Sequence, residues 1–92
     1  MNKEDIQASF LKLKEGWELI GEKKIRKEFG FKDFIKALSF VNKVGEIAEK
    51  EGHHPDIGLS YGNVVVELST HDAGELSEKD FVVAKKIDLI IK

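Results

Sequence analysis

The feature that most constrains the fold is the segment Gly52–Pro55, where a histidine pair lies between a glycine and the only proline of the chain. Gly52 follows a long amphipathic segment and is typical of the residue just past a helix C-terminus. Pro55 disfavours helical backbone at the residue before it, so His54 is expected to be extended. The sequence therefore predicts that a long helix ends here and that a sharp turn presents two imidazoles, His53 and His54.

The segment before this turn, from Asp33 to about Glu51, has the periodicity of one long helix. Its apolar side chains recur every three or four positions, so one face can be buried against a sheet. Gly45 lies inside this helix at a cost of roughly 1 kcal/mol relative to alanine, which predicts close packing against another element. The apolar face consists of Phe34, Ala37, Leu38, Val41, Val44 and Ala48, with Phe40 and Ile47 at its margins.

The N-terminal third of the chain predicts a helix followed by a β-hairpin. Asn2 is a suitable N-cap, and Gly16 is the expected end of this first helix. Residues 17–20 and 24–30 alternate between apolar and polar side chains as two short strands. Trp17 is expected to pack in the core.

The segment after the histidine pair predicts a second hairpin and a final helix. Residues 57–61 alternate as a strand, Gly62-Asn63 is the expected two-residue turn, and residues 64–70 form the next strand. Ser77 and Asp80 have the spacing of a capping box that opens the last helix. The resulting order, α-β-β-α-β-β-α, predicts an α+β fold with a four-stranded antiparallel sheet and three helices packed on one face.

Composition limits the class of protein. A chain of 92 residues predicts one domain spanning residues 1–92. Its 15 basic and 17 acidic residues are interspersed, so no basic patch for nucleic acid is expected. The absence of cysteine excludes disulfides and thiolate metal ligands and fits a cytoplasmic location. No apolar run is long enough for a membrane span, and the polar start Met1–Asp5 is unlike a signal peptide.

All three histidines, His53, His54 and His71, lie within 20 residues of one another. Imidazole exchanges protons near neutral pH, so this clustering indicates acid–base chemistry or a metal site. Zinc is disfavoured because no carboxylate–histidine spacing matches a metal motif and adjacent histidines rarely bind one ion together. On the residues alone, a structural role stays an equal alternative, since neighbours in an extended segment point opposite ways.

The order of these residues resembles the pterin-4a-carbinolamine dehydratases, and the resemblance runs through most of the chain. One departure is Ile57, because the family often has an aromatic residue at this position. The resemblance therefore does not identify the residue that stacks on the substrate ring. The segments that carry the resemblance are Gly16-Trp17, Phe31–Phe34, Glu49–Asp56, Tyr61, Leu68–His71 and Leu76–Asp80.

The resemblance implies a hydro-lyase that recycles the cofactor of pterin-dependent hydroxylases. A 4a-hydroxy-tetrahydropterin becomes quinonoid dihydropterin when its hydroxyl leaves protonated and its N5 proton is removed. This reaction needs an acid and a base but no metal and no redox cofactor. The resemblance implies acid–base roles for His53, His54 and His71. The expected substrate-binding residues are Glu49, Pro55, Ser69, Thr70, Asp72 and Asp80.

Two carboxylate positions allow more than one interpretation. Glu46, Glu49 and Glu51 crowd the end of the long helix, where the dipole is already negative, and would favour a protonated imidazole just beyond it. The hypothesis that follows is that His53 serves as the acid, although Glu49 is equally well an ordinary surface carboxylate. Asp80 is expected both to cap the last helix and to orient one of the histidines.

The last helix also bears on partners. Phe81, Val82 and Leu89 lie outside its expected buried face, so it is apolar on more than one side and predicts self-association. The resemblance implies a homodimer or homotetramer. The other expected partner is a small-molecule pterin, with no nucleic acid and no membrane. Because dehydratase-like proteins include coactivators and assembly factors, the alternative function is a non-enzymatic dimerisation or assembly partner on the same fold. The presence of all three histidines favours the enzyme.

Overall fold

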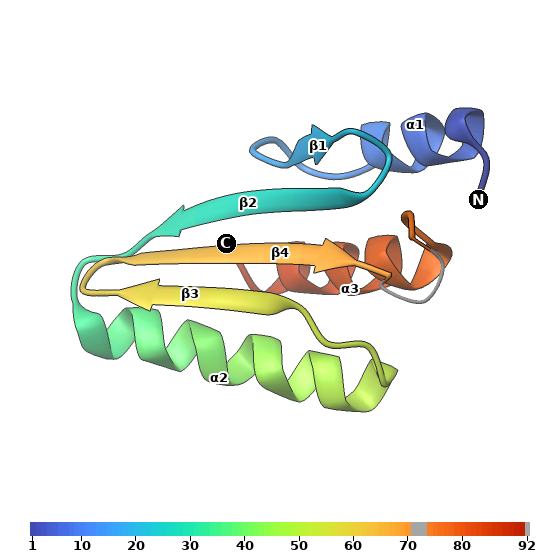
Figure 1. The fold of residues 1–92 in the computed structure, drawn as a ribbon. Coiled ribbons are helices and arrows are strands. Elements are labelled where there is room, and N and C mark those ends of the chain that lie inside the picture. Colours follow the sequence, from blue (N-terminus) through green and yellow to red (C-terminus); the bar gives the residue numbers. More distant parts are fainter. Residues whose placement is uncertain (71–73, 92) are drawn as a thin grey trace.

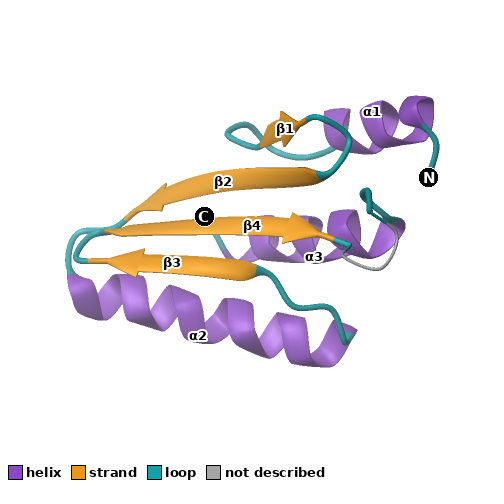
Figure 2. Ribbon diagram, viewed as in Figure 1, coloured by secondary structure: helices purple, strands orange, loops and turns teal. Residues whose placement is uncertain are grey.

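The computed structural model describes residues 1–70 and 74–91. Its elements follow the predicted α-β-β-α-β-β-α order, which confirms the α+β class (Figures 1 and 2). The helices are α1 (Lys3–Leu11), α2 (Phe34–Glu51) and α3 (Glu78–Ile90). The strands are β1 (Glu18–Ile20), β2 (Lys24–Gly30), β3 (Asp56–Ser60) and β4 (Asn63–Ser69). None of these helices is long and apolar enough to cross a membrane.

The strands form one antiparallel sheet in the order β1-β2-β4-β3. In the central pair, Ile25 lies opposite Leu68 and Phe29 lies opposite Val64, and all four side chains are buried. Because side chains alternate along a strand, these residues share one apolar face. The three helices cover that face, since their buried side chains join those of the strands in a single core: Ile6 from α1, Ala37, Phe40 and Val44 from α2, and Val83, Ala84 and Ile87 from α3.

The other face of the sheet is charged. Arg26 on β2 forms ion pairs with Glu18, Glu28 and Glu67, which come from β1, β2 and β4. The hydrogen bond that Arg26 donates to Glu28, followed by the one it donates to Glu18, raises the pKa of its guanidinium and so favours the charged form. This face is therefore compatible with water, and the core lies on the helix side alone.

Local signals set both ends of α2. The Asp33 side chain caps the start by accepting a hydrogen bond from the Lys36 backbone N–H at 2.9 Å. At the other end, Gly52 adopts left-handed backbone with φ of 64°. The His53 N–H then reaches back to the Ala48 carbonyl at 3.1 Å, the pattern of a Schellman motif. The predicted helix end is confirmed, and it fixes the backbone from which His53 projects.

Two predicted boundaries are wrong. Helix α1 ends at Leu11, and Gly16, with φ of 102°, belongs instead to the turn that enters β1. The hairpin turn between β3 and β4 is Tyr61-Gly62, because the strands pair as far as Ser60 and Asn63. A side chain at Gly62 would come within 2.8 Å of the Phe31 carbonyl oxygen, so this close approach requires glycine there.

Two expectations about helix packing are also wrong. A Cβ atom at Gly45 would meet no other atom within 4 Å, so this glycine marks no close approach. Phe34 and Leu38 are exposed, because the buried face of α2 is centred on Phe40 and Val44 instead. On α3, Phe81 belongs to the core, whereas Val82 and Leu89 are exposed as predicted.

Candidate active site

A histidine–aspartate pair joins the end of α2 to the start of α3. His53 Nε2 lies 2.5 Å from Asp80 Oδ1. The His53 side chain is 13% exposed and that of Asp80 is fully buried. Asp80 is the third residue of α3, so the first turn of that helix presents its carboxylate to the Schellman turn that carries His53.

The second carboxylate oxygen of Asp80 is also occupied. Asp80 Oδ2 accepts hydrogen bonds from Thr70 Oγ1 at 2.7 Å and from the Ser77 backbone N–H at 3.0 Å. The Ser77 contact is half of the predicted capping box, which is confirmed. Thr70 Oγ1 also lies 2.7 Å from Ser77 Oγ. Both expected roles of Asp80 are thus present in the geometry, since one carboxylate caps α3 and holds His53.

The second histidine of the pair points elsewhere. His54 Nε2 hydrogen-bonds to Glu49 Oε2, and the two side chains are 62% and 77% exposed. The expected link between the glutamates at the end of α2 and His53 is absent from the described residues. Glu49 faces His54, Glu51 pairs with Lys86, and the carboxylate beside His53 is Asp80. None of these glutamates contacts His53 directly, and the assignment of His53 as the acid stays a prediction.

The remaining expected site residues, and Ile57, lie in different places. Ser69 lies on the charged face of the sheet opposite Lys24, and so points away from Thr70, which follows it on the helix side. Pro55 is half-buried between the histidine pair and β3. Ile57 packs against the core. His71 and Asp72 lie outside the described residues.

Two depressions flank Thr70. One, of about 540 Å³, is lined by Met1, Asp5, Thr70, Ser77, Glu78 and Lys79. The other, of about 310 Å³, is lined by Lys23, Lys24, Ser69, Thr70 and Gly74. Both volumes fall in the range of small-molecule sites. Sequence reasoning missed the contribution of α1 to this region, because no local pattern places residues 1–5 beside the start of α3.

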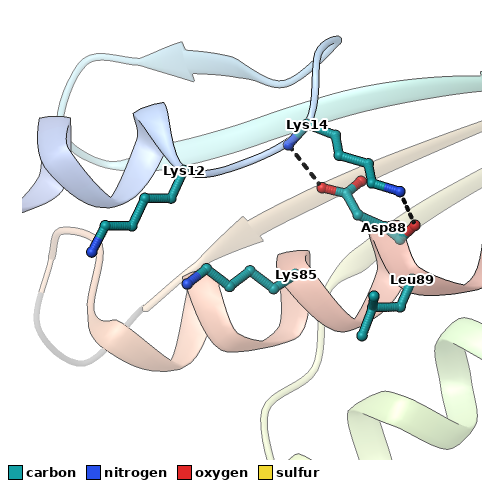
Figure 3. A pocket seen from close by; sticks show the side chains of 5 residues that line it. All are labelled: Lys12, Lys14, Lys85, Asp88 and Leu89. Atoms are coloured by element: carbon teal, nitrogen blue, oxygen red, sulfur yellow. Dashed lines mark hydrogen bonds between the residues drawn. The ribbon is translucent and has the colours of Figure 1, made fainter.

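A further depression, of about 260 Å³, lies at the other end of α3 (Figure 3). Its wall includes Asp88, which accepts hydrogen bonds from Trp17 Nε1 at 3.0 Å, Lys27 Nζ at 3.0 Å and the Lys14 backbone N–H at 3.2 Å. These donors occupy both carboxylate oxygens. Asp88 therefore links two parts of the chain to α3: the segment after α1, and strand β2. The depression is also lined by Lys12, Lys85 and Leu89.

Within residues 1–70 and 74–91, no three histidine, aspartate or glutamate side chains converge as a metal site. His53 and His54 each face a single carboxylate, on opposite sides of the segment that carries them. What the arrangement offers is an oriented, partly buried imidazole, and proton transfer requires such an oriented group. Its carboxylate partner contacts Thr70 and Ser77, which line the first of the two depressions.

Comparison with known proteins indicates a single family. Residues 1–90 match the family model described as pterin 4 alpha carbinolamine dehydratase. A protein of Trichormus variabilis is 54% identical over 86 residues, which cover 94% of this chain and 90% of its own length. A protein of Alkaliphilus metalliredigens is 46% identical over 88 residues, covering 96% and 79% respectively. Both relatives carry the name pterin-4-alpha-carbinolamine dehydratase as a provisional designation.

Solved structures agree on the fold. The crystal structure of a transcriptional coactivator/pterin dehydratase from Brucella melitensis superimposes with a TM-score of 0.91 and 31% identity, covering 100% of this chain and 98% of that one. A pterin dehydratase-like protein identified as a RuBisCO assembly factor in the alpha-carboxysome has a TM-score of 0.69 and 21% identity, over 82% and 88% of the two chains. The second likeness concerns the fold alone.

Proposed function

Because this chain belongs to the pterin 4 alpha carbinolamine dehydratase family, we propose that it dehydrates a 4a-hydroxy-tetrahydropterin to the quinonoid dihydropterin. The reaction would return the cofactor of a pterin-dependent hydroxylase to its cycle. The observation that carries the proposal is the His53–Asp80 pair beside Thr70. An imidazole held by a buried carboxylate is the kind of group that proton transfer to or from a small ring requires. Thr70 and Ser77, which donate to that carboxylate, line a depression of suitable size.

The proposed roles use the histidines as the acid and the base. The leaving hydroxyl must gain a proton and N5 must lose one, so two groups with accessible proton exchange are needed. His53 is held by Asp80, and His54 by Glu49. His71 completes the proposed catalytic set through the family motif, and Ser69, Thr70 and Asp72 are proposed neighbours of the bound pterin.

The direct test is the rate at which the protein accelerates loss of water from a 4a-hydroxy-tetrahydropterin. Separate alanine substitutions at His53, His54 and His71 should each lower turnover by at least ~10², the usual scale for losing a general acid or base. The activity should survive exhaustive chelation. Ser60→Ala removes an exposed hydroxyl at the β3–β4 turn and is a suitable control. Wild-type rates in all three histidine variants would exclude the proposed mechanism.

A second candidate function is that of an assembly partner. Large apolar side chains are exposed on all three helices, among them Leu11 on α1, Ile35 on α2 and Leu89 on α3. We propose that such surfaces let the chain form a homodimer or homotetramer. Glutamate substitutions at Val82 and Leu89 should yield smaller particles in sedimentation. A wild-type protein that stays monomeric at every concentration would contradict this proposal.

A further inference from the structure

The depression of about 260 Å³ at the end of α3 is bounded by two segments that are far apart in the sequence (Figure 3). Lys12 and Lys14 come from the segment after α1, and Lys85, Asp88 and Leu89 come from the last two turns of α3. The Asp88 carboxylate is 3% exposed and accepts a hydrogen bond from the Lys14 backbone N–H at 3.2 Å. This contact fixes the two walls relative to each other, so the depression is preformed.

Three lysines and one carboxylate line the depression, and the charge of the carboxylate is already matched. Asp88 forms an ion pair with Lys27 at 3.0 Å. Lys14 Nζ donates to the Asp88 backbone carbonyl at 3.3 Å and not to the carboxylate. Within residues 1–70 and 74–91, neither Lys12 nor Lys85 forms an ion pair. In a chain of net charge −2, this depression is therefore a local excess of positive charge.

The side chains separate a charged end of the depression from an apolar one. In Figure 3, Lys12 and Lys85 extend toward the start of α3, whereas Lys14 extends toward its end. The direction of Lys85 follows from the tilt of helical side chains toward the helix N-terminus. Leu89 lies one turn further along the same face and is 75% exposed. Two ammonium groups thus mark one end of the depression, and an aliphatic side chain marks the other.

We propose that this depression binds a small organic phosphate monoester, with its phosphate between Lys12 and Lys85 and its apolar part against Leu89. Near neutral pH a phosphate monoester carries more than one negative charge and has three terminal oxygens, so it can accept hydrogen bonds from both lysines. Lys12 is the C-cap of α1, and the negative end of that helix, about half an elementary charge, is outweighed by two ammonium groups. The volume lies just below the range for drug-sized ligands, so the ligand is small.

The probe for this site is benzyl phosphate, titrated into nitrogen-15-labelled protein while the backbone amide signals are followed. We expect saturable shifts in residues 12–14 and 85–89 with a Kd on the order of 1 mM. Binding should weaken as salt is added, because salt screens exposed charges. Inorganic phosphate should bind more weakly, since it has no apolar part, and benzyl alcohol should not bind.

Three results of this titration would overturn the proposal. The first is the absence of saturable shifts at concentrations about tenfold above that Kd. The second is equal binding of benzyl alcohol, which would show that no anion is recognised. The third is equal binding of benzoate, which would show that a single negative charge suffices and that phosphate is not selected.

Glutamine variants test which lysines hold the phosphate. Lys12→Gln and Lys85→Gln each remove one ammonium group from an exposed side chain, so the fold should be retained and the Kd should rise on the order of tenfold. Lys14→Gln is the matched control within the depression, because it removes the same charge from a side chain that extends the other way. It should raise the Kd by no more than about twofold, as a screened charge at a distance would.

A second control lies outside the depression. Lys43→Gln makes the same change of charge at an exposed position on α2 and should leave the Kd unaltered. Equal weakening by Lys12→Gln, Lys14→Gln and Lys85→Gln would indicate a diffuse field and overturn the placement between two lysines. A wild-type Kd in both Lys12→Gln and Lys85→Gln would overturn it as well. Because binding alone is measured, the result does not depend on the proposed dehydratase activity.

Discussion

Helix α3 carries two buried aspartates about two turns apart, and they contrast in what they hold. Asp80, near the start of the helix, pairs with the imidazole of His53 and accepts from Thr70 and Ser77. Asp88, near its end, is 3% exposed and pairs with Lys27. Each ties together segments far apart in sequence, and in each both carboxylate oxygens are occupied.

The difference lies in the partner. The Lys27 ammonium group and the Trp17 indole serve Asp88 as hydrogen-bond donors, so the Asp88 cluster holds the fold together. Imidazole is the side chain suited to proton transfer near neutral pH, and the carboxylate that holds His53 also contacts Thr70 and Ser77, which line a depression. The same kind of carboxylate can therefore support chemistry there. Burial alone therefore does not mark a functional aspartate. The identity and accessibility of the group that it faces decide its role.

The largest expected effect is on stability, at Asp88. Asp88→Asn removes the counter-ion of Lys27, whose side chain is 12% exposed, and leaves a buried charge unpaired. We expect the free energy of unfolding to fall by about 3 kcal/mol in denaturant titrations. Trp17→Phe removes only the indole donor and should cost about 1 kcal/mol. Wild-type stability in Asp88→Asn would show that Asp88 does not stabilise the fold as proposed.

The same substitution at the other aspartate should mainly affect turnover. Asp80→Asn keeps the size of the side chain but removes the charge that faces His53, so turnover should fall on the order of 10². Its stability should fall by only about 1 kcal/mol, because the helix cap is weakened but not removed. Steady-state kinetics and thermal melting of both asparagine variants, measured side by side, test whether Asp80→Asn mainly lowers turnover while Asp88→Asn mainly lowers stability. Equal losses of turnover in both would show that the two clusters do not differ as proposed.

The smallest effect is expected where a carboxylate–imidazole pair is exposed. Glu49→Gln breaks the contact with His54, and water screens both side chains. The free energy of unfolding should therefore change by less than about 0.5 kcal/mol, measured by the same titration. A loss of stability as large as that of Asp88→Asn would contradict the claim that an exposed pair contributes less to stability than a buried one.

The sequence by itself determined the element order and the ends of α2. Asp33 caps that helix through Lys36, and Gly52 ends it through Ala48 and His53, so each signal acts within a few residues. The capping box of α3 is equally local. Such contacts depend on backbone angles and short spacings, which residue type encodes directly. The alternation of side chains along β4 was predictable for the same reason, because it depends only on neighbouring residues.

Only the tertiary structure decided which side chains meet. His53 and Asp80 are 27 positions apart, and Trp17 and Asp88 are 71 apart. Spacing placed Asp80 at a helix cap, but the choice of His53 over His54 as its partner depends on how α2 packs beside α3. The Tyr61-Gly62 turn likewise depends on the Phe31 carbonyl, which lies beyond the hairpin. These contacts follow from packing of distant segments, about which a local pattern carries no information.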